Sequence, residues 1–433
     1  MAEKKPDIRF QGFSDEWEQK QLKEMGDTYG GLTGKTKEDF GHGKAQFVTY
    51  MNVFTNPVAT PEGVDHVEID GSQNEVKKGD IFFTTSSETP DEVGMSSVWL
   101  EDKPNTYLNS FCFGYRPKVK IDPLFSAYLM RSPSMRRSFY FLAQGISRFN
   151  ISKSKAMEIE TSLPNLNEQE KIGVFFKQLD ELIAGKEQEL EKLRQIRLAL
   201  LEKMFPSGDS DSENRGGYNG LKINALRMFG LTYNPRPNCP AIRLNGFTEP
   251  WKQKVLGEIS NSYSGGTPKV GVAKYYGGNI PFIRSGEISQ DFTELFITQD
   301  GLNNSSAKMV AKGDILYALY GATSGEVSIS KNDGAINQAI LAIIPKPNFS
   351  SRFVCYQLRK LKHHIYNTYL QGGQGNLSAG IITNLNLLFP TYEEQKKIGD
   401  FFYNFDELIS SKQQEIDKHK TIRHSLFNRM FVN

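Results

Sequence analysis

Apolar residues follow a helical period in two long stretches of the chain. In each stretch they are separated alternately by four and three residues, the heptad spacing of a helix that buries one seam. The spacing predicts long helices at 165–206 and 391–433. The seam positions are Ile172, Phe176, Leu179, Ile183, Leu190, Leu193, Leu200 and Met204 in the first helix, and Ile398, Phe402, Phe405, Ile409, Ile416, Leu426 and Met430 in the second.

Basic residues interrupt both seams at matching places: Lys186 and Arg197 in the first helix, Lys412 and Arg423 in the second. Two helices with matching seams can pack on each other, so we predict an antiparallel coiled coil that acts as a spacer, with globular parts at its opposite ends. The first helix would extend about 57 Å at a rise of about 1.5 Å per residue, more than one small domain needs. The alternative is that each helix buries its seam only against its own globular part.

Both helices have the same start signal. A proline, which cannot continue a preceding helix, is followed by Asn165-x-x-Glu168 in the first helix and by Thr391-x-x-Glu394 in the second. A capping residue with an acid three positions later is typical of a helix N-terminus. We therefore interpret both glutamates as helix caps rather than catalytic acids.

Short apolar runs bounded by Gly, Asn and Pro precede each helix. Runs such as "GDIFFTT", "GDILYALY" and "NQAILAIIP" are typical of strands. They predict an α+β fold, with mixed α/β globules at 1–164 and 241–390. The segment 207–240 is polar and rich in Gly and Ser, which predicts a flexible linker.

The two halves of the chain repeat one unit. "IRFQGFSDEWEQKQLKE" from Ile8 and "IRLNGFTEPWKQKVLGE" from Ile242 share nine of seventeen residues at a spacing of 234. The spacing is 228 between "LNSFCFGYRPK" and "INQAILAIIPK", and 226 between "NEQEKIGVFFKQLDELI" and "YEEQKKIGDFFYNFDELI" counted from their shared glutamates. The whole chain is therefore interpreted as a pseudo-two-fold internal repeat.

Composition favours a globular protein of two or three domains. The chain has 433 residues, of which 38% are hydrophobic and 24% charged. The three cysteines, Cys112, Cys239 and Cys355, show neither a disulfide framework nor zinc-ligand spacing. No apolar run approaches the roughly 18 residues of a membrane span, and the first residues have no apolar signal region. We expect a soluble, cytoplasmic protein without a membrane partner.

Motifs that carry catalytic chemistry are missing from the sequence. "YGGLTGKT" resembles a phosphate-binding loop, but only three residues separate Gly30 from Gly34 where the motif needs four, and the second copy has Pro268 in the turn. The Asn-Pro pairs are not followed by the residues of an adenine-methyltransferase motif, and the histidines lack metal-ligand spacing. The sequence thus favours a binding protein with no catalytic or metal-ligating residues and no cofactor of its own.

Double-stranded DNA is the partner that the repeat suits, because major-groove faces recur about every 34 Å. The net charge of +2 requires any such binding to rest on local patches. "RSPSMRRSFY" and "QGISRFNISKSK" offer basic and amide side chains in the first copy, as do "RKLKHH" and "QGGQGNLSAG" in the second. Each cluster could equally be a solvated surface. The segments between the repeated frameworks diverge, which suits two different half-sites.

The sequence resembles the specificity subunits of type I restriction-modification systems over its whole length. The resemblance rests on the paired openings from Ile8 and Ile242, "SGGTP" at 264–268, the "KGDI" pairs, and the two segments P-x-x-x-E-Q-x-K-I-x-x-F-F-x-x-x-D-E-L-I. The first copy departs from the pattern with "YGGLTGK" where the second has "YSGGTPK", so the role of that loop in the first copy is open.

The resemblance implies that 1–164 and 241–390 are target recognition domains, each reading half of a bipartite DNA sequence. The conserved helices at 165–206 and 391–433 would set the spacer length and dock two methyltransferase subunits. S-adenosylmethionine, ATP and Mg²⁺ would belong to the methyltransferase and restriction subunits, which methylate adenine and cleave DNA. This chain would supply specificity and assembly.

Candidate site residues are chosen from local chemistry. For DNA we select Arg148, Asn150, Lys153 and Lys155 in the first domain, and Arg284, Ser285, Tyr320, Gln374 and Asn376 in the second. For the coiled coil and its partners we select Ile172, Phe175, Phe176, Leu179, Ile183, Leu190, Leu193, Leu200, Ile398, Phe401, Phe402, Phe405, Ile409, Ile416 and Leu426.

Three other classes remain as alternatives. A non-catalytic coiled-coil scaffold for protein partners would leave no sequence-specific footprint on DNA. A tandem ligand-binding module, for instance for carbohydrate, would bind through each half independently of helix length. An unrecognised nuclease would cleave DNA in the presence of metal ions.

Overall fold

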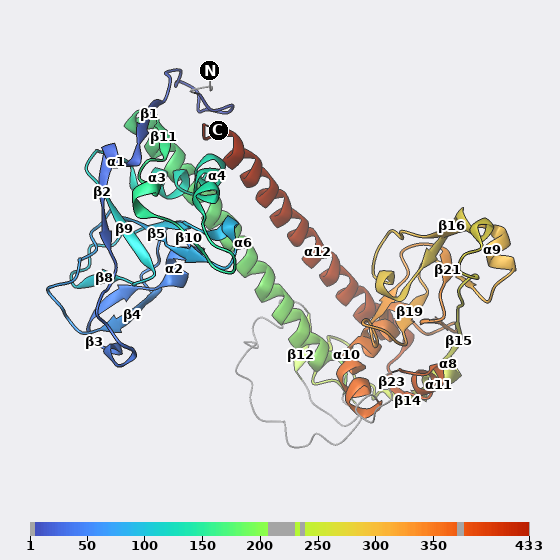
Figure 1. Ribbon diagram of the computed structural model, residues 1–433. Coiled ribbons are helices and arrows are strands. Elements are labelled where there is room, and N and C mark those ends of the chain that lie inside the picture. The colour runs from blue at the N-terminus through green and yellow to red at the C-terminus, as the bar shows by residue number, and fades with distance from the viewer. Residues whose placement is uncertain (1–4, 207–229, 234–238, 370–375, 433) are drawn as a thin grey trace. The chain divides into compact units, whose positions relative to one another are not determined.

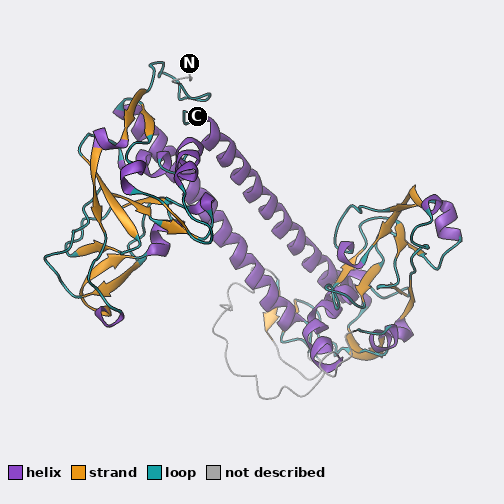
Figure 2. Cartoon of the chain, in the orientation of Figure 1, coloured by secondary structure: helices purple, strands orange, loops and turns teal. Residues whose placement is uncertain are grey.

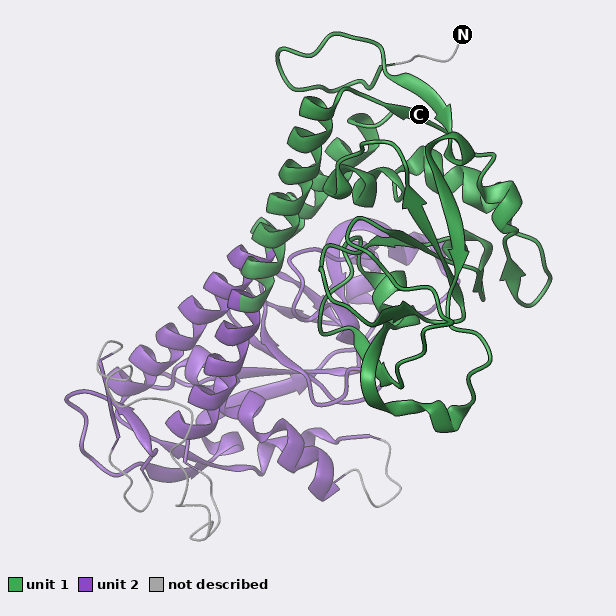
Figure 3. Ribbon diagram, turned by 90° about the vertical axis from the view of Figure 1, so that its left-hand side faces the viewer, with its two compact units in different colours: residues 1–188, 414–433 green, residues 189–413 purple. Residues whose placement is uncertain are grey.

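The chain forms two compact units, drawn in different colours in Figure 3. Unit 1 comprises residues 1–188 and 414–433, and unit 2 comprises residues 189–413. The division falls inside both long helices, so each unit combines one globular part with one part of each helix. The computed structural model describes residues 5–206, 230–233, 239–369 and 376–432.

Most of the predicted linker at 207–240 lies outside the described residues. Its described part includes strand β12 (Leu231–Tyr233), which pairs with β13 (Ile242–Leu244) at the opening of the second repeat.

Helices α6 (Leu166–Met204) and α12 (Tyr392–Arg429) are the two long helices that the heptad spacing predicts. They begin where the capping residues indicate. The side-chain oxygen of Asn165 accepts a hydrogen bond from the amide of Glu168 at 3.1 Å, and that of Thr391 accepts from Glu394 at 3.4 Å. Each helix is uninterrupted over 39 and 38 residues respectively.

The globular part of unit 1 mixes strands and short helices (Figures 1 and 2). One sheet has the strand order β2-β9-β5-β7 and another has β4-β3-β8, while β1 pairs with β11 and β6 with β10. The strands are β1 (Glu18–Gln21), β2 (Gly26–Gly30), β3 (Phe40–Val48), β4 (Val64–Val67), β5 (Ile81–Thr84), β6 (Ser86–Ser87), β7 (Ser96–Val98), β8 (Thr106–Leu108), β9 (Cys112–Pro117), β10 (Phe149–Asn150) and β11 (Glu160–Leu163). The helices are α1 (Leu22–Met25), α2 (Tyr50–Thr55), α3 (Pro123–Leu129), α4 (Pro133–Leu142) and α5 (Lys153–Ala156), with 3₁₀ turns η1 (Lys37–Asp39) and η2 (Pro90–Glu92).

Unit 2 repeats this architecture. Its sheets have the strand orders β15-β22-β19-β20 and β17-β16-β21-β18, and β14 pairs with β23. The strands are β14 (Lys252–Val255), β15 (Ser260–Ser264), β16 (Tyr276–Ile283), β17 (Phe296–Ile297), β18 (Lys308–Val310), β19 (Ile315–Ala318), β20 (Val327–Ile329), β21 (Gly334–Ile336), β22 (Ile340–Pro345) and β23 (Asn386–Phe389). The helices are α8 (Leu256–Ile259), α9 (Gln299–Asn303), α10 (Ser351–Tyr369) and α11 (Ala379–Thr383), with 3₁₀ turns η3 (Ala273–Tyr275) and η4 (Ser285–Glu287).

The repeat extends to strand register. Ile81 pairs with Tyr115 in unit 1, and Ile315 pairs with Ile343 in unit 2, which are the positions that the sequence alignment equates. Both "KGD" turns that precede β5 and β19 place their glycine at a positive φ, +90° and +101°, where other residues are strained. The prediction of an α+β internal repeat is confirmed.

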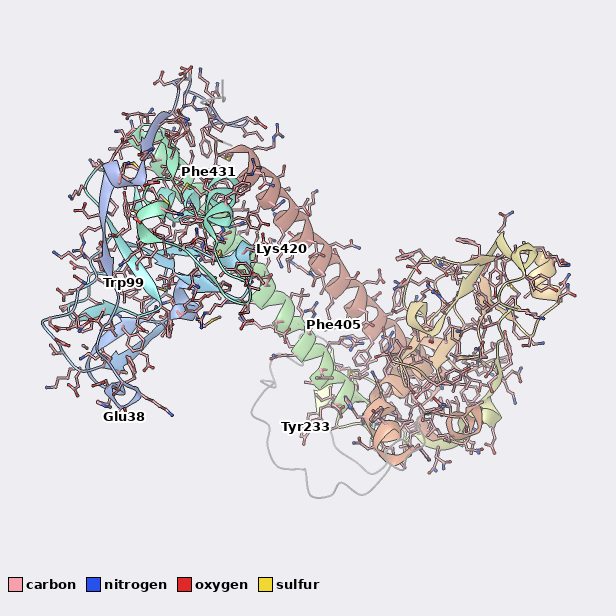
Figure 4. The ribbon with its side chains drawn as sticks, viewed as in Figure 1. Glu38, Trp99, Tyr233, Phe405, Lys420 and Phe431 are labelled. Atoms are coloured by element: carbon pink, nitrogen blue, oxygen red, sulfur yellow. The ribbon has the colours of Figure 1, made fainter. Side chains whose placement is uncertain are left out.

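Each unit has its own aromatic core. In unit 1, Trp17 from the repeated opening lies against Phe125 of α3 and Phe431, which follows α12 and is labelled in Figure 4. In unit 2, Trp251 lies against Phe205, which follows α6, and Phe353 of α10. Trp17, Trp99 and Trp251 are all at most 3% exposed.

Candidate nucleic-acid interface

A buried ion pair joins the repeated opening of each unit to the start of a long helix. Arg9 donates two hydrogen bonds to the Glu168 carboxylate at 2.7 Å, and Arg243 donates two to Glu394 at 2.7 Å. Both carboxylates are fully buried. Asn165 and Thr391 cap the helices as predicted, but the glutamate side chains, which we interpreted as caps, anchor the two arginines instead. The sequence contained a signal for these ion pairs, because Arg9 and Arg243 are identical residues at matching positions of the repeat.

The helices pair antiparallel within unit 1. Asp180 of α6 accepts hydrogen bonds from Arg423 of α12, one of them at 3.2 Å, and from the Tyr128 hydroxyl at 3.0 Å. Farther along, Lys186 of α6 pairs with Glu415 of α12 at 2.6 Å. Lys420, labelled in Figure 4, pairs with Glu187 at 2.6 Å.

Unit 2 contains the matching contacts. Asp406 of α12 accepts hydrogen bonds from Arg197 of α6, from Arg359 at 2.7 Å and from the Tyr356 hydroxyl at 2.7 Å. Burial raises the pKa of Asp406, but its hydrogen bonds and ion pairs outweigh that effect and hold the pKa below its usual range. Arg197 and Arg423, which interrupt the hydrophobic seams, therefore make matching ion pairs between the two helices, one in each unit.

The seam residues divide by exposure. Those that reach the cores or the helix contact are buried, and the flanking ones are half-buried. The buried set is Ile172, Phe176, Ile183, Leu190, Leu200, Ile398, Phe402, Phe405 and Ile416. The half-buried set is Phe175, Leu179, Leu193, Phe401, Ile409 and Leu426. Some packing is also against the globular part, since the rings of Phe176 and Tyr128 lie 5.4 Å apart.

The DNA candidates of unit 1 lie around Ser86, just beyond the end of strand β5; we call this end of the unit its tip. Asn150 pairs with Ser86, and the Arg148 side chain donates to the Ser86 hydroxyl at 3.1 Å. Lys153 and Lys155 are exposed on α5, three and five residues beyond Asn150. Among the described residues, no carboxylate forms an ion pair with Arg148, Lys153 or Lys155. These cations are therefore available to contact DNA phosphates or base edges.

The DNA candidates of unit 2 are less closely grouped. Tyr320 follows β19, and Asn376 is exposed next to Leu377, whose amide donates to the carbonyl of Leu319 at 2.9 Å. The same contact in unit 1 runs from Ile151 to Thr85 at 3.0 Å. Asn376 and Tyr320 thus stand where unit 1 has Asn150 and Ser86. Gln374 lies outside the described residues.

Arg284 and Ser285 lie at η4, and Arg284 is held by two carboxylates. It pairs with Glu287 at 2.6 Å and with Glu294 at 2.7 Å, and these hydrogen bonds raise its pKa. Arg284 would have to leave or share these partners to contact a base. The strand register, which pairs Val48 with Leu108 in unit 1 and Ile283 with Ile336 in unit 2, makes Thr49 the equivalent of Arg284 and Tyr50 the equivalent of Ser285. The Tyr50 hydroxyl donates to the carbonyl of Ser86 at 2.8 Å. Sequence reasoning selected Ser285 but missed Tyr50 at the matching position of unit 1.

Two of the basic clusters read from the sequence prove to be structural. Arg131 donates to the carbonyls of Ser96, Val53 and Phe54, and Arg136 donates to three carbonyls at 91–94. Burial lowers the pKa of both guanidinium groups to about 10. These side chains tie α3 and α4 to the sheet, and the expectation that "RSPSMRRSFY" supplies free basic groups is wrong for both. In "RKLKHH", Arg359 is likewise bound internally, to Asp406.

Within the described ranges, no group of three or more His, Cys, Asp or Glu residues could hold a metal ion. In the same part of the chain, no helix is both long and apolar enough to cross a membrane.

Comparison with known proteins identifies relatives over the whole chain. A family model described as the type I restriction modification DNA specificity domain matches residues 14–195 and 248–418. The putative type I restriction enzyme MjaX specificity subunit of Methanocaldococcus jannaschii is 23% identical, over 96% of this chain and 93% of that protein. The HindI specificity subunit of Haemophilus influenzae is 22% identical, over 76% of this chain and 81% of its own length. The match to the MjaIX specificity subunit of M. jannaschii, at 28% identity, spans 44% of that relative.

Solved structures share the fold. The S subunit of the type I restriction-modification system from M. genitalium superposes with a TM-score of 0.61 at 17% identity, over 99% of both chains. A chain from a study of complex assembly and conformational transition in the type I system gives a TM-score of 0.54 at 16% identity, over 96% of this chain and 97% of that one.

Proposed function

This chain belongs to the type I restriction modification DNA specificity family, and from that premise we propose that it is the specificity subunit of such a complex, in which unit 1 and unit 2 each read one half of a bipartite DNA target. It acts by binding and assembly, without chemistry of its own.

One observation carries the proposal: the two units share a framework but differ at their tips. The four-stranded sheets β2-β9-β5-β7 and β15-β22-β19-β20 share one strand order and register, and both openings are anchored by the same Arg–Glu pair. At equivalent places beyond the strands, unit 1 has Tyr50 and Ser86 where unit 2 has Ser285 and Tyr320. A constant framework with different tip chemistry suits two different half-sites, because base edges are distinguished by donors, acceptors and methyl groups.

The partners follow from the same proposal. Methyltransferase subunits would dock on the long helices α6 and α12, and restriction subunits would join that assembly. Adenine methylation with S-adenosylmethionine, which requires the base to leave the duplex, and ATP- and Mg²⁺-dependent cleavage would occur in those partners. The role of the helices in setting the length of the unspecified spacer stays a prediction.

Methylome sequencing tests the proposal directly. DNA from cells with and without this chain, each supplied with the cognate methyltransferase subunit, is compared for N6-methyladenine. We expect one gapped, two-part motif that depends on the chain. If the complex assembles and no such motif appears, the DNA proposal fails, and the coiled-coil scaffold for protein partners replaces it.

A further inference from the structure

Three segments that meet at Thr85 and Ser86 in unit 1 each carry one exposed apolar side chain. Met51 is 58% exposed, Phe111 is 56% exposed and Ile146 is 97% exposed. They come from three segments far apart in the sequence, and we refer to them together as the apolar tip. Apolar groups gathered on the surface of a globular protein usually mark a place of interaction.

The dipeptide Thr85–Ser86 holds the three segments together. The amide and hydroxyl of Thr85 both donate to the carbonyl of Phe111, at 3.0 and 2.8 Å. Tyr50, the neighbour of Met51, donates to the carbonyl of Ser86 at 2.8 Å. The loop that carries Ile146 pairs with Ser86 through Asn150.

The loop around Ile146 is tightly closed. Gln144 and Asn150 exchange two backbone hydrogen bonds, each of 2.9 Å. Gly145 has a φ of +147°, and a Cβ there would lie 2.0 Å from the carbonyl oxygen of Arg148. Only glycine fits this turn. The loop therefore holds a defined backbone conformation in which Ile146 is exposed to solvent.

Polar groups suited to DNA surround the apolar tip. Arg148 lies against Ser86, and the exposed Lys153 and Lys155 follow in the next turn of chain. The nearby carboxylate of Glu92 already accepts hydrogen bonds from Ser87 and Thr89. Cations beside apolar groups fit the major-groove edge of an A·T pair, where the thymine methyl lies next to hydrogen-bonding atoms and phosphates flank the groove.

Unit 2 lacks this surface at the equivalent described positions. The strand register places Gly286 where unit 1 has Met51, and Ala339, which is 5% exposed, stands where unit 1 has Phe111. The equivalence is structural, since Leu319 donates to the carbonyl of Ala339 at 2.8 Å as Thr85 does to Phe111. The difference between the units is therefore one of recognition chemistry on the same framework.

We propose that Met51, Phe111 and Ile146 form a contact surface for the 5-methyl groups of thymine, so that unit 1 selects its half-site partly through thymines. This inference rests on the proposed function and assigns specificity-determining residues to it. The half-site of unit 1 accordingly contains thymine on at least one strand.

The test uses the assembled complex with its methyltransferase subunits and labelled duplexes of the motif found by methylome sequencing. In separate duplexes, the thymines of each half-site are replaced by deoxyuridine, which removes only the methyl group. We expect about fourfold weaker binding for each contacted methyl that is lost, the factor that corresponds to about 0.8 kcal/mol. The penalty should fall on one half-site and should be smaller in the Ile146→Ala complex. Ile69→Ala, an Ile of the same unit that is 51% exposed, should keep it.

Other outcomes overturn the inference. An undiminished penalty in Ile146→Ala, or no penalty at either half-site, would mean that the apolar tip does not contact thymine methyls. A variant that no longer copurifies with the methyltransferase subunits would make the tip a protein interface instead. Loss of sequence-specific binding by the unmodified complex would refute the proposed function itself.

Discussion

At the scale of single residues, the buried Arg–Glu pairs are the most sensitive points. In unit 1, Arg9→Ala would leave the Glu168 carboxylate buried without its counter-charge, and we expect a loss of about 3–5 kcal/mol in the stability of that unit. Arg9→Lys, which keeps the charge but loses the two-pronged geometry, should lose less. Thermal unfolding of the purified chain measures both. The exposed pair Asp7–Arg429 provides the control, because Asp7→Asn should have little effect.

Glu287 predicts a pH dependence for unit 2. Burial raises its pKa from 4.5, but hydrogen bonds from Arg284, Glu294 and Thr293 outweigh this and lower the pKa to about 2. A lowered pKa stabilises the folded state above the unfolded value, and the contribution is lost as the pH falls from about 5 toward 2. Over that interval it amounts to about 3 kcal/mol.

Urea unfolding of wild type and Glu287→Gln at several pH values measures this contribution. The stability difference should be largest at pH 7 and should shrink steadily below pH 5. Glu294→Gln, at the exposed end of the same network, should change little. A difference that stays constant down to pH 3 would contradict the assigned hydrogen-bond network.

Sequence reasoning reached some of these residues and missed others for a physical reason. Arg197 and Arg423 were visible as interruptions of a seam, because a periodic pattern exposes its own exceptions. Their partners Asp406 and Asp180 could not be recognised from the sequence, because an ion pair between two helices depends on how the helices are aligned along each other. Likewise Arg131 looked like a free cation until the fold placed backbone carbonyls around it.

At the scale of elements, the paired helices should tolerate exchanged charges better than single reversals. Asp180→Arg or Arg423→Asp alone places like charges together in unit 1 and should destabilise the pairing of α6 with α12. The double exchange should recover much of the loss, since the two groups remain adjacent. Thermal unfolding of the four chains gives the coupling free energy, and a double exchange no better than the single changes would contradict the observed register.

Asp406 should be more costly to remove than Asp180. It balances both Arg197 and Arg359, whereas Asp180 balances Arg423 alone among the described ion pairs. Asp406→Ala leaves two guanidinium groups without their partner, and we expect a loss of about 3–5 kcal/mol against a smaller loss for Asp180→Ala. Chemical denaturation followed by circular dichroism compares them, with the exposed Glu191→Ala as the reference.

The long elements were the most predictable ones. Helices α6 and α12 follow from many seam residues acting together, and their starts follow from Asn165 and Thr391. Short elements such as β6 and β10, two residues each, have no periodic signal. They exist because Asn150 returns to Ser86 in space, which no local pattern encodes, and for the same reason the tip of unit 1 was only partly foreseen.

At the scale of the whole molecule, the repeat predicts that the units are interchangeable. Replacing residues 241–390 by residues 7–164 gives a chain with the recognition part of unit 1 twice. The framework should accept it, because Arg9 and Glu168 have counterparts in Arg243 and Glu394. We expect both halves of the methylated motif to carry the same sequence, as determined by methylome sequencing. Two unlike halves, from a complex that assembles normally, would contradict the assignment of one half-site to each unit.

The internal repeat, the α+β class and the family were all accessible from the sequence, because identical residues at Trp17 and Trp251 or Arg9 and Arg243 define a shared framework. The recognised bases were not, since framework residues carry no base-specific information. The tips differ in sequence between the units, so the tip residues of one copy do not predict those of the other.

The buried tryptophans give the molecule an optical reporter in each unit. Among the described residues, each indole N–H of Trp17, Trp99 and Trp251 lacks a hydrogen-bond partner, and each ring is shielded from water. Their fluorescence should therefore be blue-shifted in the native chain and should move to longer wavelength as a unit opens. Trp251 is the single tryptophan of unit 2, so Trp251→Phe confines the emission to unit 1. The difference between the two traces would then record the melting of unit 2 separately, with no dye attached.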